Sequence, residues 1–258
     1  MILLTGPTGS GKTTTLYAIL HQLNGEGVNI VSLEDPVEYY IEGINQSQIR
    51  PDIDYTFASG LRHILRQDPD IIMVGEIRDE ETADLAIHSA LTGHVLLSTL
   101  HTNDAVGVIP RLIDMGIGSF LLPTSLNLAI AQRLVRRLCE KCKKEIVAPP
   151  PAVKIIEEEL AKLSPAQRKA FSLEKPLKIY RPVGCKFCGN KGTTGRIALY
   201  EMMMMTPQLE EIINKDLTET RIKEEAQRQG MITMRQDGIA KVLRGFISFE
   251  EMLRVVEE

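Results

Sequence analysis

The chain has 258 residues, and 43% of them are hydrophobic, which is enough for one sizeable core and a small second module. Its formal net charge of −4 gives no overall attraction for nucleic acid, and with 5% aromatic residues and no tryptophan it lacks a stacking platform for single strands. No apolar stretch approaches the about 20 residues that a membrane helix needs. We therefore expect a cytoplasmic protein with no membrane span and no nucleic-acid partner.

The first motif is GPTGSGKT at residues 6–13, which fits the pattern G-x-x-x-x-G-K-[ST]. Its glycines let backbone N–H groups turn toward phosphate oxygens, Lys12 can reach the β- and γ-phosphates, and the Thr13 hydroxyl can hold Mg²⁺. An apolar run at 2–4 predicts a buried strand before it, and residues 12–23 predict a helix after it. The alternative is a glycine-rich turn without a ligand. The expected nucleotide-binding residues are Gly6, Pro7, Thr8, Gly9, Ser10, Gly11, Lys12, Thr13 and Thr14.

Further strand-length apolar runs occupy residues 29–33, 71–74 and 95–100, with helical patterns at 57–67 and 80–91 between them. Nearly unbroken apolar strands that alternate with helices predict an α/β fold with a doubly wound, mostly parallel sheet. Such sheets bind ligands at the carboxyl ends of their strands.

Four chemically active residues directly follow predicted strands: Gly6, Glu34, Glu76 and His101. Hydrolysis of a magnesium–nucleotide needs a carboxylate near the metal and a group that orients the attacking water. Glu76 is expected on the metal side together with Thr13, and Glu34 is expected as the base or water-positioning group. The division of labour between the two stays open, because Gly75-Glu76 stands where many P-loop enzymes have Asp first. For each, the alternative is a solvated carboxylate in a loop.

Two histidines bracket the run at 95–100. His101 is expected on the nucleotide side, where it could sense the γ-phosphate. His94 lies about 23 Å away if the strand is continuous, so the two cannot share a metal, and a structural role for His94 is equally favoured. Arg62 and Arg66 lie four residues apart on one predicted helix face. They could neutralise a phosphate, in cis or across a subunit interface, or form a salt-bridged surface.

Two C-x-x-C pairs, Cys139/Cys142 and Cys185/Cys188, are separated by residues 143–184. Four thiolates suit a closed, structural Zn²⁺ site, and the alternatives are a redox pair or free thiols. The insert is expected to contain a stiff, extended spacer at 147–153 and helices at 155–163 and from Pro165. The basic run at 132–145 is expected to be a solvated face, with an acidic lipid or partner as the alternative.

Beyond residue 206 the pattern is helical, with helices expected at 207–214, 218–229, 233–243 and 248–256.

The motifs GPTGSGKTTTLY, LEDPVEY, LRHILRQDPDIIMVGEIRD, TGHVLLSTLHTNDA, AQRLVRRLCEKC and GCKFCGNKGTTGR together resemble the ATPases of type II secretion and type IV pilus assembly. The resemblance implies that residues 6–13 are the Walker A loop, that Glu34 lies in the acidic box and that Glu76 is the Walker B glutamate. His94 and His101 then form the histidine box, and the four cysteines form a zinc module. Arg62, Arg66 and Arg196 match arginines that serve ATPase activity or subunit contacts.

The resemblance also implies an organisation and a function. We expect a RecA-like P-loop NTPase core at 1–137, a tetracysteine zinc module at 138–200 and a helical region at 201–258, equivalent to the family's carboxyl-terminal ATPase domain without its amino-terminal domains. The implied activity is a motor that hydrolyses ATP to ADP and phosphate with Mg²⁺. It would work as a hexamer at the inner membrane, bound to a platform protein.

By this resemblance, the cysteines favour the assembly or secretion branch over retraction motors. Within it, the motifs VNIVSLEDPVEY, GINQSQIRPDI and STLHTNDA give a slight preference for the pilus. The alternative is a non-hydrolysing, nucleotide-binding module that docks to an inner-membrane partner. A nucleic-acid helicase of related fold is disfavoured by charge and composition.

Overall fold

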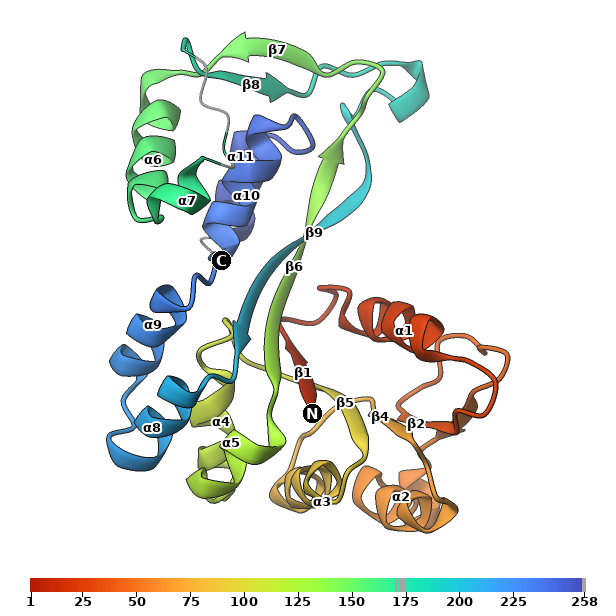
Figure 1. The fold of residues 1–258 in the computed structure, drawn as a ribbon. Coiled ribbons are helices and arrows are strands. Elements are labelled where there is room, and N and C mark those ends of the chain that lie inside the picture. The colour runs from red at the N-terminus through yellow and green to blue at the C-terminus, as the bar shows by residue number, and fades with distance from the viewer. Residues whose placement is uncertain (170, 172–174, 257–258) are drawn as a thin grey trace. The chain divides into compact units, whose positions relative to one another are not determined.

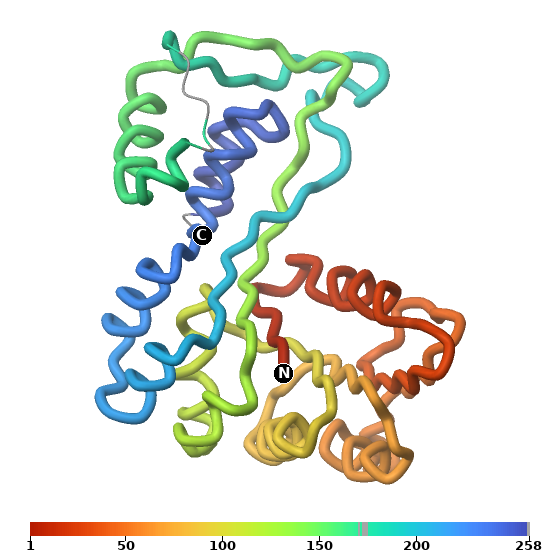
Figure 2. The backbone as a smooth tube through the Cα atoms, in the orientation of Figure 1, coloured from red at the N-terminus to blue at the C-terminus, as the bar shows by residue number. Residues whose placement is uncertain are grey.

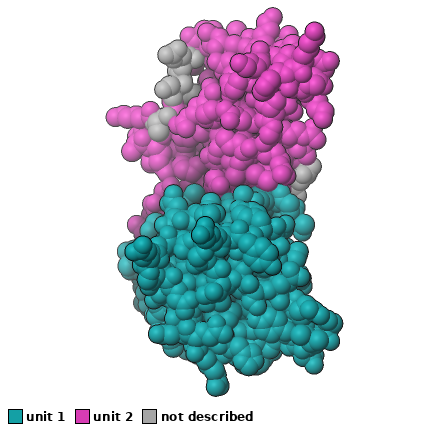
Figure 3. Space-filling model, turned by 90° about the vertical axis from the view of Figure 1, so that its right-hand side faces the viewer, with its two compact units in different colours: residues 1–131, 202–226 teal, residues 132–201, 227–258 magenta. Residues whose placement is uncertain are grey.

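The computed structural model describes residues 1–169, 171 and 175–256 (Figure 1). The described chain forms two compact units, one of residues 1–131 and 202–226 and the other of residues 132–201 and 227–256 (Figure 3). Two long strands, β6 (Leu128–Leu138) and β9 (Thr193–Met204), have residues in both units and lie side by side in the main sheet (Figure 2). The predicted division at residues 137 and 200 stays a prediction.

In the main sheet, the described strands are ordered β3-β2-β4-β5-β1-β6-β9. The bounds are β1 (Ile2–Thr5), β2 (Ile30–Glu34), β3 (Asn45–Gln48), β4 (Ile71–Val74) and β5 (Val95–Leu100). β1 pairs in parallel with β5 and β6, and the pairs β2–β3, β2–β4 and β4–β5 are also parallel. The α/β class with a mostly parallel sheet is thereby confirmed.

Burial of both sheet faces explains why the strands were visible in the sequence. Side chains that alternate in direction along a strand, such as those of Leu3, Leu4 and Ile72, are all fully buried. The helices α1 (Lys12–Leu23) and α3 (Glu80–Leu91) have the predicted bounds. The shorter helices of this unit are α4 (Val108–Asp114) and α5 (Leu122–Ser125).

The prediction of one helix at 57–67 is partly wrong. α2 (Phe57–Ile64) ends three residues early, and Leu65–Gln67 form a 3₁₀ turn. The chain must leave the helix to enter β4, and it does so at Asp68, whose φ of 50° is left-handed, directly before Pro69. Asn29 holds this exit through its side-chain amide, which donates to the carbonyl oxygens of Gln67 and Asp68 at 3.0 Å.

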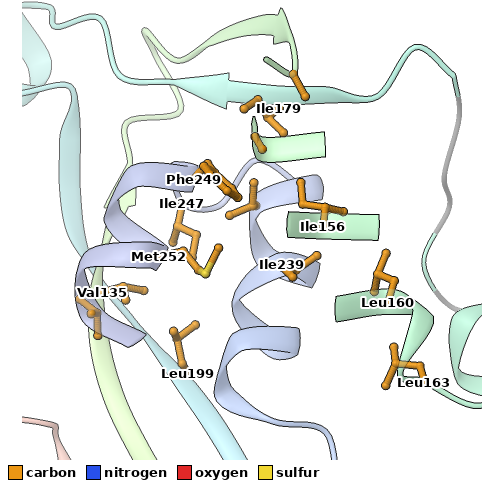
Figure 4. Packing of buried hydrophobic residues seen from close by; sticks show 14 residues of the cluster. Val135, Ile156, Leu160, Leu163, Ile179, Leu199, Ile239, Ile247, Phe249 and Met252 are labelled. Carbon is orange, nitrogen blue, oxygen red and sulfur yellow. The ribbon is translucent and has the colours of Figure 1, made fainter. Parts of the chain in front are cut away.

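The second unit is built around α10 (Met234–Leu243) and α11 (Phe249–Val256), which pack with α6 (Pro150–Ala161) and the hairpin of β7 (Lys144–Val147) and β8 (Lys178–Arg181). A short helix, α7 (Pro165–Arg168), starts at the capping box of Ser164 and Gln167, as the sequence predicts. Figure 4 shows the apolar cluster of this unit, in which Val135 of β6 and Leu199 of β9 face Met252 of α11.

The predicted extended spacer at 147–153 is wrong in its second half, because α6 begins at Pro150. Proline is compatible with the first turn of a helix, where its missing N–H would have no partner. Ala152, in this first turn, is buried with Ile156 in the cluster.

The predicted carboxyl-terminal helices are present as α8 (Pro207–Lys215), α9 (Glu219–Arg228), α10 and α11. Thr206 and Thr233 cap α8 and α10 through their side-chain oxygens. Among the described residues, no helix combines the length and the apolar character needed to cross a bilayer.

Candidate nucleotide site and cysteine cluster

The glycine-rich loop joins β1 to α1 at the carboxyl edge of the sheet. Gly9 and Gly11 have φ values of 80° and 86°, which a side chain would strain. Gly11 is the N-cap of α1, no side chain caps this helix, and no acidic residue lies in its first turn. The free N–H groups and the positive end of the helix dipole are therefore open to an anion. This geometry fits a bound phosphate.

Lys12 lies at the mouth of the loop. Its Nζ donates to the carbonyl oxygens of Gly6 at 2.8 Å and Pro7 at 3.1 Å. Burial lowers the pKa of Lys12, and the opposing influence is the negative charge of Glu76, which raises it. A half-buried ammonium with only carbonyl partners fits a binding site for phosphate oxygens, which would add full negative charge.

Glu76 and His101 meet at the same edge. His101 Nε2 lies 3.2 Å from Oε2 of Glu76, and Arg78 donates to Oε1. Burial alone would raise the pKa of Glu76, but the hydrogen bonds and charges of Arg78 and His101 outweigh it, so its pKa is lowered. Glu76 thus stays a carboxylate, the form that can bind Mg²⁺ or its water shell.

Backbone links hold these strand ends in place. The Thr5 hydroxyl lies 2.8 Å from that of Thr102 and accepts the backbone N–H of Thr102 at 2.7 Å, which fixes the end of β1 beside the loop after β5. The Thr99 hydroxyl donates to the Gly75 carbonyl at 2.8 Å, and the Ile77 N–H donates to the Thr99 carbonyl at 2.9 Å. Both chain neighbours of Glu76, Gly75 and Ile77, are therefore hydrogen-bonded to Thr99 of β5, which fixes the position of Glu76.

Glu34 ends β2 and is buried, with 2% of its surface exposed. Its Oε2 accepts a hydrogen bond from the Tyr17 hydroxyl, and its Oε1 accepts from Ser32 Oγ at 2.5 Å and Gln46 Nε2 at 3.1 Å. These three donors satisfy a carboxylate that would otherwise be costly to bury.

The other predicted residues lie away from the loop. His94 precedes β5, and its Nδ1 lies 3.1 Å from the Ser89 carbonyl oxygen and 3.2 Å from the Thr92 hydroxyl. Because a carbonyl oxygen only accepts, Nδ1 carries a proton there and closes the turn after α3.

The arginines also lie outside the loop. Arg62 pairs with Glu81, and both are exposed. The exposed Arg66 lies in the 3₁₀ turn before β4, at the amino ends of the strands and opposite the loop. Arg196 belongs to the other unit, where it is exposed on β9.

The four cysteines come together in the second unit. Their sulfur atoms all lie within 4.8 Å of one another, and the pairs Cys139–Cys185 and Cys142–Cys188 are 3.9 Å apart. A tetrahedral site with Zn–S bonds of about 2.3 Å places its sulfurs about 3.8 Å apart, so the residues fit Zn²⁺.

Backbone N–H groups around the sulfurs also suit thiolates. Cys188 Sγ accepts from the N–H groups of Cys185 and Gly192, each at 3.2 Å. Burial would raise the pKa of Cys188, but these hydrogen bonds and those with neighbouring thiols lower it to about 6.

The basic run at 132–145 is largely used within its own unit. Arg133 donates to the Val255 carbonyl at 2.7 Å, and Arg137 pairs with Glu140 at 3.1 Å while lying over the Phe246 ring. Lys143 donates to the Gly245 carbonyl at 2.9 Å. The basic run is thus only partly the solvated face that was expected. Arg133, Arg137 and Lys143 hold the segment against the helices of the second unit.

Sequence reasoning missed several residues that build the nucleotide edge: Thr5, Tyr17, Ser32, Gln46, Arg78 and Thr99. Ser32 and Arg78 carried a usable signal, since each lies two residues from a predicted carboxylate, Glu34 or Glu76, and alternate residues of a strand point to one side.

A glycine-rich loop between a buried strand and an uncapped helix, at the carboxyl edge of a parallel sheet, defines a RecA-like P-loop NTPase fold. The solved structure entitled "Crystal Structure of the Pilus Retraction Motor PilT and Bound ADP" has this fold, with a TM-score of 0.69 and 27% identity over 98% of this chain and 60% of that one. The model of the family described as "Type II/IV secretion system protein" matches residues 1–254. The chain belongs to this family.

Individual relatives include both branches of the family. The chain is 49% identical to the type IV pilus assembly ATPase PilB of Myxococcus xanthus over 98% of its length, and 47% identical to the type II secretion system ATPase E of Vibrio cholerae over 100% of its length. It covers 43% and 48% of these relatives, so it spans about half of their length.

Proposed function

We propose that the chain is an ATP-hydrolysing motor domain that powers pilin or pseudopilin assembly in a type IV pilus or a type II secretion system. The proposal is carried by the juxtaposition of Lys12, Glu76 and His101, which come from three separate strand ends and form one edge. The names of relatives in both branches support it. Because the identities to the two branches are nearly equal, they do not separate pilus assembly from secretion.

The loop residues from Gly6 to Thr14 are proposed to bind ATP or ADP, with backbone N–H groups and Lys12 on the phosphates. Thr13 and Glu76 would hold Mg²⁺, which supplies charge neutralisation at the transferred phosphoryl group. Glu34 is proposed as the base that accepts a proton from the attacking water. His101 would report the γ-phosphate to Glu76, 3.2 Å away.

The arginines are proposed to act between subunits. Arg66 is at the sheet edge opposite the loop of its own chain, and Arg62 is engaged by Glu81, so neither lies at the phosphates of its own chain. We propose a homo-oligomer, which is a hexamer in the full-length protein. In it, Arg62, Arg66 and Arg196 would contact a neighbouring subunit or the nucleotide phosphates bound there. The four cysteines are proposed to hold a structural Zn²⁺. The implied location is the cytoplasmic side of the inner membrane, through a platform partner.

The test is ATP turnover by the chain across a range of protein concentrations, with Glu34→Gln as the variant and Glu26→Gln as a matched control on an exposed carboxyl of the same unit. We expect specific activity to rise with concentration, to fall by about 10²-fold or more in Glu34→Gln and to be unchanged in Glu26→Gln. Nucleotide binding without turnover at any concentration would instead favour the non-hydrolysing platform module.

A further inference from the structure

A hydrogen-bond network joins the nucleotide-binding helix to Glu34. Tyr17 lies in the second turn of α1, five positions after Lys12, and its side chain is fully buried. Its hydroxyl donates to Oε2 of Glu34. The hydroxyl oxygen of Tyr17 also accepts the Glu38 N–H at 3.3 Å and lies 3.4 Å from Gln46 Nε2. Tyr17 is therefore the one described residue that connects α1 with this carboxylate.

The three donors to Glu34 constrain its orientation. A carboxylate has about four lone-pair sites, and here Ser32 and Gln46 occupy two on Oε1 while Tyr17 occupies one on Oε2. Among the described residues, no donor is left for the second site on Oε2. A buried base with one unclaimed lone pair is arranged to take a single proton from one direction.

Packing fixes the phenol ring as well as its hydroxyl. The Tyr39 ring meets the Tyr17 ring edge-on, with centroids 4.7 Å apart and an interplanar angle of 83°. Gln46 is itself held, because its Oε1 accepts the Ile41 N–H at 2.6 Å and its Nε2 donates to the Tyr39 carbonyl at 3.1 Å. The donors to Glu34 are thus supported by a second layer of contacts, as precise catalytic groups require.

We propose that Tyr17 is a positioning residue for the hydrolytic reaction: from the helix that starts at the phosphate loop, its hydroxyl fixes the carboxylate of Glu34 so that one lone pair faces the attacking water. This inference rests on the proposed function and adds a residue to it. Burial, together with the hydrogen bond and charge of Glu34, raises the pKa of Tyr17 far above its usual value. The phenol therefore remains a donor throughout the working pH range.

The side chains around Glu34 include few charged groups. Of the elements packed on β2, strands β3 and β4 contribute no charged side chain, and the titratable residues of α2, Arg62 and His63, are exposed. The next residue, Asp35, is exposed and lies 3.5 Å from Arg78. Glu38 is exposed and contacts Tyr17 through its backbone alone. Tyr17 is the titratable side chain that touches Glu34.

The test compares Tyr17→Phe with Tyr39→Phe, which removes a hydroxyl from the ring that packs against Tyr17 without touching Glu34. In Tyr17→Phe we expect kcat to fall about tenfold with the KM for ATP within about twofold, because the lost contact acts on the base and not on nucleotide binding. Tyr39→Phe should retain the wild-type kcat and KM.

Each outcome has a defined meaning. Turnover in Tyr17→Phe with an unchanged kcat would overturn the role of Tyr17 and leave the proposed function standing. Absence of turnover in the wild-type chain at every concentration would overturn the proposed function itself, and Tyr17 as a positioning residue with it. A kcat loss with a comparable rise in the KM for ATP would mark a structural effect and contradict the proposal. If Tyr17→Phe does not fold, Ser32→Ala removes another donor to the same carboxylate and carries the same expectation.

Discussion

The nucleotide edge of the first unit and the cysteine cluster of the second are assembled in opposite ways. At the edge, the site residues come from the ends of parallel strands whose own burial holds them. In the cluster, four sulfurs from two short knuckles lie within 4.8 Å of one another, and the knuckles have little core of their own. The first site therefore depends on the packed sheet, whereas a Zn²⁺ ion held by the four cysteines, as proposed, would itself link the two knuckles and stabilise the fold.

This difference predicts which substitutions affect chemistry and which affect stability. A polar residue at the nucleotide edge can be removed while the strands beneath it remain packed. With Zn²⁺ bound as proposed, removing a cysteine would delete a metal bond and with it a link between the chain segments before and after the insert.

The largest effect is expected for Cys185→Ser. Loss of one ligand should release Zn²⁺ and destabilise the second unit by about 4 kcal/mol or more, while nucleotide binding by the first unit persists. Metal content by mass spectrometry and calorimetric unfolding measure the two effects. Lys186→Ser, next to it on the same knuckle, is the control. An unaltered melting curve together with lost zinc would mean that the cluster does not support the fold.

Lys12→Ala should show the reverse pattern. We expect turnover to fall about 10²- to 10³-fold, because a fixed charge on the phosphates is lost, and the unfolding temperature to stay near that of the wild type. Exposed Lys154, changed to Ala, is the control. Since burial lowers the pKa of Lys12, nucleotide affinity of the wild type should begin to fall at a lower alkaline pH than an ordinary lysine would give. A strong loss of stability in Lys12→Ala would contradict the comparison.

The same contrast explains what the sequence could predict. β4 and β5 have their predicted bounds because strands buried on both faces are continuously apolar. β3 was missed because its sequence, NQSQ, is wholly polar. Its side chains form hydrogen bonds instead of packing: Gln46 donates to Glu34, and the Ser47 hydroxyl pairs with that of Tyr55. β6 was hidden by arginines that reach backbone carbonyls and rings of the second unit.

For the sites, local spacing was sufficient for the loop and the cysteines but not for the contacts between segments. The bond between Tyr17 and Glu34 joins a helix to a strand across an intervening loop, and no sequence pattern marks it. The Thr99 hydroxyl that fixes Gly75 looks like any strand residue. Such contacts depend on sheet order, which places β4 between β2 and β5 although it follows both β2 and β3 along the chain.

The two histidines around β5 provide a smaller test. His94→Ala removes the hydrogen bond that closes the turn after α3, so we expect a loss of about 1 kcal/mol in stability and little change in turnover. His101→Ala, at the other end of the strand, should lower turnover with little loss of stability. Thermal unfolding and steady-state kinetics of both variants check the pair. A tenfold loss of turnover in His94→Ala would place that residue in the catalytic machinery.

A small effect on folding is also expected for Glu76→Gln, although its turnover should fall strongly. Arg78 and His101 are about half exposed, so solvent weakens their interaction with Glu76 and its contribution to stability should be below about 1 kcal/mol. Because the pKa of Glu76 is lowered in the folded chain, this contribution is present above the pKa of the unfolded carboxyl, about 4.3, and is lost as the pH falls through the lower folded value. The difference in unfolding free energy between the wild type and Glu76→Gln should therefore shrink below about pH 4. A difference that grows on acidification would mean that burial, which favours the neutral acid, outweighs the two cations, and Glu76 would then be poorly suited to hold a metal ion.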